Sequence, residues 1–436
     1  MRKFRILTIL LLFLIGVHQL SAQNSDVLVL EIEGPVTPAM ANYFERGIEA
    51  GETQGAEAVL ILLDTPGGSV SITLDIVQAF RNADVPVIVY IYPSGAQAAS
   101  AGSVITFAAH AAGMAPQTVI GAASPINSDG SDINETAYRK AVEDLKATMR
   151  GLTAERGAEA TAIAEAMIED AKAVSAQEAL DVGLIDAIAD SPTDLLTQLD
   201  GKTVLVNGEE VILETAVATQ TNYGMNLLEH LLHAVANPLL VGILMAIGIQ
   251  AIIIEISNPG GWVAGLIGVI FVGLALYGLG QLPVNWLGLG LIIVAFVLFL
   301  AEVLTANHGA LALAGTLCLL GGLLLLFNTP GTPEFARLSL PSALAITAGT
   351  ALFFLFIVGK AMQAQKAKPY GGFDDLDRDL GLAKTTFTES AEADTYNGTI
   401  MILGELWQAT SHEPIAFGDP VEVIGKEGFT LQVIKK

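Results

Sequence analysis

A serine among very small residues is the feature of this sequence that most directly suggests chemistry. Residues 95–102 read GAQAASAG and place Ser100 after an apolar run that ends at Tyr92, where we expect a strand to lead into a helix. Small neighbours let a substrate backbone approach the hydroxyl, and a helix N-terminus favours negative charge on oxygen. The segment therefore predicts Ser100 as a nucleophile; the alternative is a small-residue helix that only packs tightly.

A glycine pair would supply the second part of such a site. Residues 64–69 read DTPGGS and follow another apolar run, so Gly67 and Gly68 are expected at a sharp turn. Backbone N–H groups at this turn, with no side chain in the way, can stabilise a developing oxyanion. Pro-Gly-Gly by itself usually marks only a turn, so this interpretation depends on the serine segment that follows.

A serine nucleophile also needs a base, and few histidine or lysine residues of this region could act as one. Between residues 23 and 222 the only histidine is His110, about three helical turns beyond Ser100, which predicts a structural or surface role for it. Residues 23–201 contain only three lysines, Lys140, Lys146 and Lys172. A Ser-Lys pair is an established variant of serine activation, provided that the lysine is neutral.

The elements that would position these residues can be predicted from apolar periodicity. Strand-like and helix-like runs alternate along the first part of the chain, at residues 27–32, 39–54, 58–63, 70–81 and 85–92. This alternation predicts a parallel sheet with helical crossovers, hence an α/β domain that we place at 23–222. A further helix is expected from Glu135 to about Glu155. Ser175 and Glu178 form a plausible capping box that starts another.

The ends of this domain are set by a leader and a membrane region. Basic residues, an apolar run and a small residue at Ala22 predict a signal peptide over residues 1–22. Beyond the domain, a membrane region is expected at 223–363. Its five apolar segments are each near the length that spans a bilayer, at 238–256, 261–280, 286–304, 309–327 and 341–359.

The basic residues after the last segment predict the orientation in the membrane. Lys360, Lys366 and Lys368 mark that end as cytoplasmic. With five spans the catalytic domain then lies outside the cytoplasm, and the protein is a multi-pass protein of the cell (inner) membrane. Glu255 and Glu302 lie near segment ends, where we expect them to reach the interface rather than to act in a proton relay.

The C-terminal part is predicted as a small all-β domain. An acidic linker at 364–383 is followed by short alternating runs at 384–436, which indicate a five-strand barrel such as an OB-fold.

The composition of the chain excludes some classes of function. The net charge is −24, and residues 23–222 carry 29 acidic and 9 basic side chains, so nucleic acid is an unsuitable partner. Cys318 is the only cysteine, so no thiolate metal site or intramolecular disulfide is proposed.

Four segments together resemble a known family. They are DTPGG at 64–68, PSGAQAASAG at 93–102, SAQEAL at 175–180 and GLID at 183–186. With the order of the three domains, the chain resembles long-form NfeD proteins, which are membrane serine proteases of the Clp-protease class. The resemblance covers essentially the whole mature chain. It implies a Clp-protease/crotonase-like α/β domain, an all-α multi-span membrane region and a small all-β OB-fold-like barrel.

The resemblance also implies roles for individual residues. Ser100 takes the nucleophile position and Lys140 the general-base position, while the oxyanion hole is formed at Gly67, Gly68 and Ala101. A peptide or protein is the implied substrate, with apolar segments preferred. Stomatin-like membrane proteins and the lipid bilayer are the implied partners, in membrane protein quality control. We expect a homo-oligomer and no metal or organic cofactor.

Two other functions remain open from the residues. A non-catalytic scaffold could use the α/β domain and the barrel only to assemble membrane partners. A crotonase-like acyl-CoA enzyme would use the same glycine-rich oxyanion geometry, although an exported domain would meet little CoA.

Overall fold

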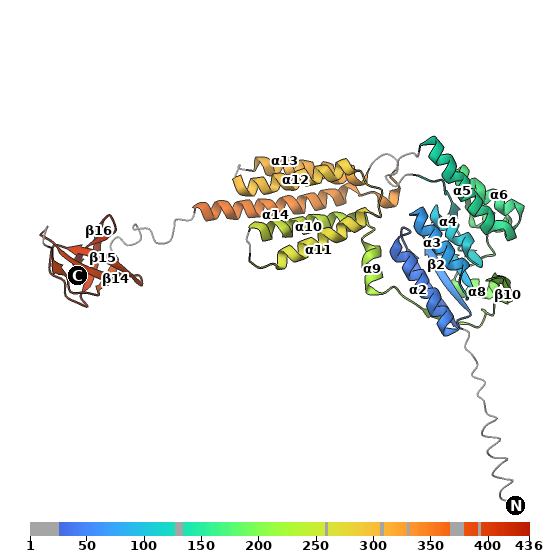
Figure 1. Ribbon diagram of the computed structural model, residues 1–436, viewed down its shortest axis with the longest axis horizontal. Helices are drawn as coiled ribbons and strands as arrows, with labels where there is room; N and C mark the ends of the chain where they lie inside the picture. The colour runs from blue at the N-terminus through green and yellow to red at the C-terminus, as the bar shows by residue number, and fades with distance from the viewer. Residues whose placement is uncertain are drawn as a thin grey trace, which may run out of the picture. The chain divides into compact units, whose positions relative to one another are not determined.

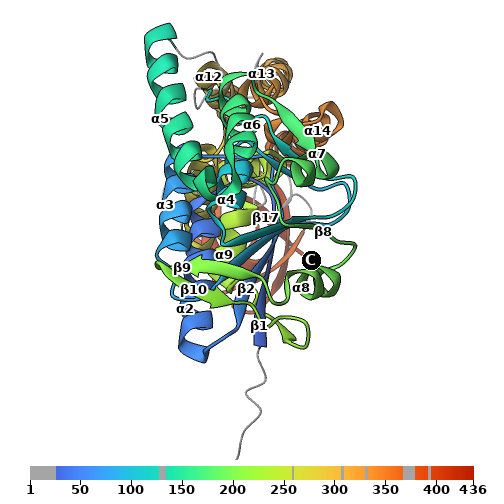
Figure 2. The same ribbon diagram turned by 90° about the vertical axis from the view of Figure 1, so that its right-hand side faces the viewer.

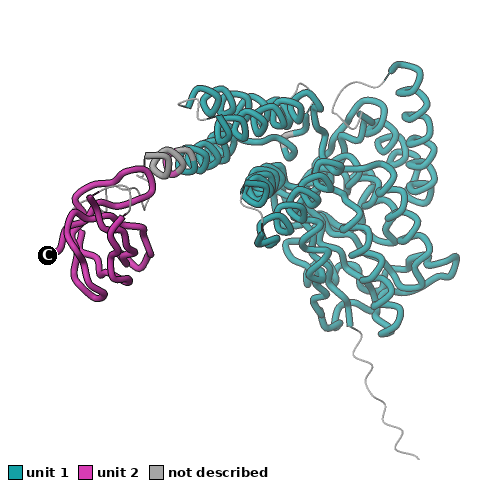
Figure 3. Tube along the Cα trace, turned by 60° about the vertical axis from the view of Figure 1, so that its left-hand side comes forward, with its two compact units in different colours: residues 1–358 teal, residues 359–436 magenta. Residues whose placement is uncertain are grey.

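The computed structural model describes most of the chain as two compact units. The described residues are 26–126, 134–257, 260–305, 309–328, 332–366, 379–390 and 394–436. One unit ends at Val358 and the other begins at Gly359 (Figure 3). The predicted signal peptide at 1–22 lies outside the described residues, as does most of the predicted linker at 364–383.

A six-stranded parallel sheet forms the centre of the first unit (Figure 1). Its spatial order is β11-β1-β2-β3-β5-β8, and every neighbouring pair is parallel. The strands are β1 (Asp26–Glu33), β2 (Ala58–Asp64), β3 (Val87–Ile91), β5 (Ala111–Met114), β8 (Ala187–Ile188) and β11 (Thr219–Asn222). The predicted α/β class and the first three strands are confirmed.

Both faces of the sheet are buried, because successive side chains of each strand alternate between two apolar layers. Residues such as Leu28 and Ile61 pack under helices α2 (Pro38–Gln54), α3 (Val70–Arg81) and α4 (Ala101–Ala108). Their neighbours Val29 and Leu60 belong to a second apolar cluster with residues of α8 (Pro192–Leu199) and β9 (Thr203–Val206). Figure 2 shows α8 and the hairpin that β9 forms with β10 (Glu209–Ile212).

A small three-stranded sheet and a helical hairpin complete the domain. The sheet has the order β4-β6-β7, with β4 (Gln97–Ala99), β6 (Val119–Gly121) and β7 (Ala173–Ser175). The hairpin consists of α5 (Glu135–Thr153) and α6 (Ala158–Glu169), which lie side by side in Figure 2. The predicted capping box of Ser175 and Glu178 is confirmed at the start of α7 (Ala176–Asp181).

The membrane region contains five apolar helices at the predicted positions. After the short α9 (Leu227–Ala234) they are α10 (Pro238–Ser257), α11 (Val263–Leu279), α12 (Trp286–Thr305), α13 (Ala310–Phe327) and α14 (Leu340–Lys366). Four are long and apolar enough to cross a bilayer, whereas α11 has only 17 residues. A helix of that length spans about 26 Å, somewhat short of a hydrocarbon core. The described residues thus establish four candidate spans, not the five predicted.

These helices form two similar hairpins, each closed by a glutamate. Glu302, near the end of α12, accepts hydrogen bonds from the N–H groups of Gly309, Leu311 and Ala312 at the start of α13. Glu255, near the end of α10, accepts in the same way from the N–H groups of Trp262 and Gly265 around the start of α11. A carboxylate satisfies the unpaired donors of a helix N-terminus and complements its dipole. Both glutamates therefore have a helix-capping role.

The two caps differ in burial, and this difference predicts unequal effects of mutation. Glu302 is 1% exposed, whereas Glu255 is only partly buried. Glu302→Ala leaves buried N–H groups without an acceptor, so we expect it to destabilise the full-length protein by about 2–4 kcal/mol. Glu255→Ala is the matched control and should cost less than half as much, since water reaches its donors. Thermal unfolding in detergent measures both; equal losses would contradict the capping role of Glu302.

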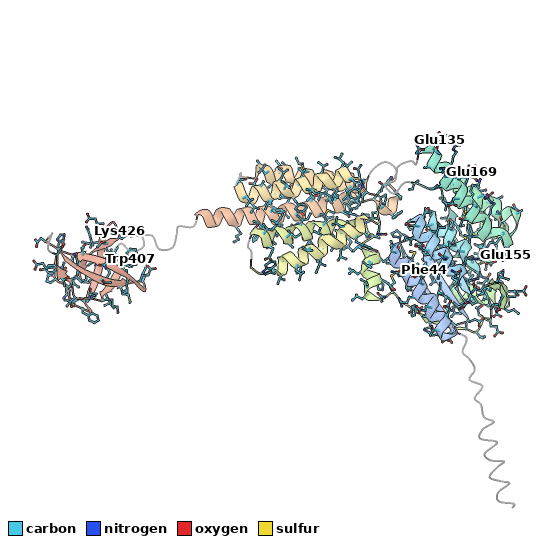
Figure 4. All side chains as sticks on the ribbon, viewed as in Figure 1. Phe44, Glu135, Glu155, Glu169, Trp407 and Lys426 are labelled. Atoms are coloured by element: carbon cyan, nitrogen blue, oxygen red, sulfur yellow. The ribbon has the colours of Figure 1, made fainter. Side chains whose placement is uncertain are left out.

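The second unit contains a closed five-stranded barrel, as predicted. The order β12-β16-β17-β15-β14 is completed by pairing of β14 with β12, and a two-residue strand, β13 (Thr388–Glu389), is added at β14. The barrel strands are β12 (Leu380–Ala383), β14 (Tyr396–Ile402), β15 (Glu405–Ser411), β16 (Pro420–Glu427) and β17 (Thr430–Lys435). On its surface Lys426 lies over the Trp407 ring, 5.6 Å from the centroid (Figure 4).

Candidate active site

Ser100 occupies a strained backbone position between β4 and α4. Its φ of 54° and ψ of −117° lie in a region that favours glycine. The conformation is held from both sides, because the N–H of Ser100 donates to the Gly121 carbonyl (2.8 Å) and its own carbonyl accepts from the N–H of Ser103 (3.0 Å). The predicted strand-to-helix junction is therefore confirmed, through the three-residue β4.

The glycine turn (residues 64–69) lies directly against this serine. Thr65 pairs with β4, as its N–H donates to the Gln97 carbonyl (2.7 Å) and its carbonyl accepts from the N–H of Ala99 (2.9 Å). Gly67 has a φ of 105°, and a Cβ built on it would lie 2.6 Å from the Cβ of Ser100. The structure thus brings together the two segments that the sequence singled out, and only glycine fits at position 67.

Two backbone N–H groups beside Ser100 are available as donors. Among the described residues, the N–H of Gly68 and that of Ala101 have no hydrogen-bond partner. Ala101 is the first residue of α4, so its N–H is one of the donors that a helix start leaves free. Gly68, Ser100 and Ala101 line one recess of about 60 Å³. This arrangement can place a carbonyl carbon at the hydroxyl and its oxygen near free donors.

Apolar side chains form the rest of this recess, and the sequence analysis did not single them out. Val70 and Leu74 come from α3, Ile126 from the segment after β6, and Leu145 from α5. Val70 and Ile126 are about half exposed, at 45% and 52%. Large exposed apolar side chains around this serine suit an apolar ligand. In the sequence they are marked only as apolar residues that directly follow the glycine turn or lie on the predicted helices.

Lys140 is not brought into the recess. On a helical wheel this lysine is opposite the apolar stripe of Val142, Leu145 and Met149, which predicts an outward position. In the structure Lys140 lies near the start of α5 and is exposed, and the three apolar residues are buried. Figure 4 marks Glu135 at the outer end of this helix. Leu145 does line the recess, five residues and about 7.5 Å along the helix axis from Lys140.

The other two lysines of this region do not line the recess either. Lys146 forms an ion pair with Glu169, whose hydrogen bond raises the pKa of the ammonium group and keeps it protonated. Lys172 is exposed and follows α6, and its carbonyl accepts from the N–H of Ala122. Within the described ranges, no three His, Cys, Asp or Glu side chains gather as a possible metal site.

His110 has the structural role that was predicted. Its Nδ1 accepts a hydrogen bond from the N–H of Val87 (2.9 Å) at the start of β3, past the end of α4 that is remote from Ser100. Burial lowers the pKa of His110 from 6.5 to about 4, and the nearby Arg81 charge contributes. The imidazole is therefore neutral in the folded protein at neutral pH.

This depressed pKa predicts a contribution of His110 to acid sensitivity. Between pH 6.5 and 4 the unfolded chain binds a proton that the folded chain does not, so stability falls as pH falls through that window. The contribution amounts to roughly 3 kcal/mol. His110→Asn keeps an acceptor near Nδ1 and removes the titration. Denaturant unfolding at pH 7 and pH 4 should show a smaller acid loss in the variant; equal losses would contradict the assignment.

Comparison with known proteins places this geometry in a family. The chain matches three family profiles: the NfeD1b N-terminal domain over residues 26–207, the NfeD integral membrane domain over 239–360, and the NfeD-like C-terminal, partner-binding domain over 383–435. The three matches follow one another along nearly all of the described chain.

Individual relatives agree with these matches. The membrane-bound protease PH1510 of Pyrococcus horikoshii is 35% identical over 448 aligned residues, covering 100% of this chain and 98% of the relative. The membrane protein NfeD1b of Bacillus subtilis is 25% identical over 82% of this chain and 79% of its own length. Among solved structures, the 1510-N membrane protease specific for a stomatin homolog from Pyrococcus horikoshii is 31% identical. It covers 48% of this chain and 96% of its own, with a TM-score of 0.41.

The full-length identity to a curated relative is the deciding comparison, because it includes the α/β domain, the membrane helices and the barrel together. The resemblance noted from four short segments is thereby confirmed. With a parallel-sheet α/β domain, apolar membrane helices and a C-terminal barrel, this chain belongs to the NfeD family of membrane proteins.

Proposed function

We propose that this protein is a membrane-anchored serine endopeptidase whose nucleophile is Ser100. The observation that carries the proposal is the strained Ser100 backbone, held against a glycine turn beside the free N–H groups of Gly68 and Ala101. Strain of this kind persists only where surrounding structure maintains it, and it concentrates at functional sites. The full-length relative described as a membrane-bound protease supports the same activity.

In the proposed reaction the Ser100 hydroxyl attacks the peptide carbonyl carbon while a base takes its proton. The carbonyl oxygen becomes an oxyanion, for which the N–H groups at Gly68 and Ala101 are the proposed donors, with Gly67 keeping the turn clear of side chains. Collapse of this intermediate expels the amine, which receives the proton, and leaves an acyl-enzyme that water hydrolyses. The half-exposed Val70 and Ile126 favour apolar substrate side chains.

Lys140 is the base that we propose, and its exposure sets a condition on the active state. A lysine accepts a proton only when neutral, which requires that the ammonium group be desolvated or placed near other positive charge. The side chain is exposed in the single chain. The proposal therefore requires that a second subunit of a homo-oligomer, or the bound peptide, cover the first turns of α5.

A fluorophosphonate serine probe tests this assignment on the full-length protein in detergent. Labelling of wild type should map to Ser100 by mass spectrometry and should be lost in Ser100→Ala and in Lys140→Ala at matched melting temperature. Lys146→Ala is the control and should label normally. Absence of labelling in folded wild type would favour the non-catalytic scaffold, while retained labelling in Lys140→Ala would assign the base elsewhere.

We further propose a stomatin-like membrane protein as partner, in membrane protein quality control. The C-terminal barrel matches a domain described as partner-binding, which supports a protein partner. Co-purification of a tagged stomatin-like protein from the same cell with the full chain, but not with a chain lacking residues 379–436, tests this. Recovery of the partner with both chains would indicate that it binds outside the barrel.

The orientation that we propose places the α/β domain outside the cytoplasm and the barrel inside, in the inner membrane. This requires that α11 cross the bilayer despite its 17 residues, since four spans would leave both domains on one side. Single cysteines at the exposed positions Ser71 and Thr388, introduced in a Cys318→Ala background, can be probed on intact cells with an impermeant thiol reagent after the outer membrane has been permeabilised. Reaction at position 71 alone supports the proposal; reaction at both or neither contradicts it.

A further inference from the structure

A short segment of the chain lies in space between the glycine turn and α9, the helix that precedes the membrane region. This linking strip (residues 33–37) runs beside the turn and is hydrogen-bonded to it. The N–H of Gly34 donates to the Asp64 carbonyl, and the N–H of Val36 donates to the Gly67 carbonyl, both at 2.9 Å. A Cβ on Gly68 would lie 2.4 Å from the Val36 carbonyl oxygen. The linking strip therefore supports the turn on one side, as β4 does through Thr65 on the other.

The other side of the linking strip is held by His233 of α9. The Nε2 atom lies 2.8 Å from the Glu33 carbonyl oxygen, which can only accept, so Nε2 carries the proton. The Nδ1 atom lies 3.4 Å from the Oγ1 of Thr37, a buried residue that also caps α2. One imidazole thus contacts both ends of a five-residue strip that lies next to the turn.

Helix α9 is itself fixed to the α/β domain by a salt bridge. Arg46 of α2 donates to both carboxylate oxygens of Glu229, Nε to Oε1 at 2.9 Å and Nη2 to Oε2 at 2.6 Å. Burial would raise the pKa of Glu229, but the bonds from Arg46 and the Asn226 N–H outweigh it and lower that pKa. The guanidinium also lies over the Tyr223 ring, 4.5 Å from its centroid. His233 is thereby held at a defined place.

One side of the linking strip borders an open recess instead of packed side chains. A recess of about 630 Å³ lies between the α/β domain and the start of α10, lined by Glu33, Pro35, Pro66, His233 and Leu240 among others. Since this space borders both the linking strip and the turn, close packing does not hold the strip there. On this side the hydrogen bond from His233 to the Glu33 carbonyl holds the strip, in addition to the backbone bonds to the turn and the buried Val36 side chain.

We propose that His233 is a positioning residue for the Ser100 reaction. It holds the linking strip, and through it the N–H groups of the glycine turn, in the place where an oxyanion forms. Helix α9 ends four residues before α10 begins. A change in the position of this first membrane helix is therefore transmitted to the glycine turn through His233. The inference rests on the proposed function, because it assumes that the turn supplies oxyanion donors.

Kinetics of the full-length protein in detergent test the inference. His233→Ala is expected to lower kcat about 10- to 100-fold with KM changed less than threefold, since a displaced donor acts on the transition state more than on substrate binding. His233→Gln places an N–H donor near the Nε2 position and should restore most of kcat. His230→Ala, on an exposed residue of the same helix, is the control and should behave as wild type. Unchanged kcat in His233→Ala, or no rescue by glutamine at equal melting temperature, would overturn the inference.

Hydrogen exchange separates failure of this inference from failure of the proposed function. Peptides covering residues 33–40 and 64–70 should exchange faster in His233→Ala than in wild type and His230→Ala, whether or not the protein hydrolyses peptides. Faster exchange in a protein without hydrolysis supports the positioning role and rejects the protease. Hydrolysis by wild type with unchanged exchange and kcat in His233→Ala supports the protease and rejects the positioning role.

Discussion

Ser100→Ala and Ser100→Gly should both abolish peptide hydrolysis while differing in stability. Removal of a serine nucleophile lowers turnover by about 10⁴-fold or more, because the acyl-enzyme can no longer form. Alanine keeps a Cβ at a φ of 54°, so the backbone strain remains. Glycine removes that strain and costs only some entropy of the unfolded chain. We expect Ser100→Gly to be about 1 kcal/mol more stable than Ser100→Ala.

The comparison requires activity and unfolding to be measured on the same preparations. Turnover of an apolar peptide and chemical denaturation of the full-length protein give the two quantities. Ser103→Ala is a useful control, since its hydroxyl is buried and bonds to the Ala98 carbonyl at 2.9 Å. It should lose stability but retain turnover. Hydrolysis that survives both Ser100 substitutions would exclude this residue as the nucleophile.

Much of the α/β domain could be predicted because its strands are buried on both faces. Such strands read as continuous apolar runs, and β1, β2 and β3 follow the predicted runs within a few residues. The glycine turn follows β2 and the serine segment follows β3, and these two segments lie close together because the carboxyl ends of parallel strands share one edge of a sheet. The contact of Gly67 with Ser100 is the physical result.

Other features depend on contacts that a single sequence does not reveal. The bond between Arg46 and Glu229 joins residues 183 positions apart, and helix α9, which begins at a capping box of Asn226 and Glu229, was not predicted from the sequence. Five spans were predicted, whereas α11 starts only after a turn at Trp262 and has 17 residues, so four of the described helices reach the length of a span. Periodicity assigned Lys140 to the outer face of α5 but cannot tell what covers that face in an assembly.

The glycine turn gives the second large expected effect, through Gly67→Ala. The new methyl group would overlap the Ser100 side chain, 2.6 Å from its Cβ and 3.2 Å from its Oγ, at a backbone φ of 105°. Either the serine or the turn must move, which misplaces the nucleophile relative to the N–H donors. Loss of one oxyanion donor costs about 10²- to 10³-fold in kcat, and we expect a loss of at least that size.

A matched control separates this steric effect from backbone strain alone. Gly95 also has a positive φ, 88°, but nothing lies within 4 Å of a Cβ built on it. Gly95→Ala should therefore cost about 1 kcal/mol of stability and leave kcat within a fewfold of wild type. If both variants lost kcat equally, the strain and not the contact with Ser100 would be responsible. A loss confined to Gly67→Ala, with fluorophosphonate labelling reduced in parallel, would place the turn at the reacting serine.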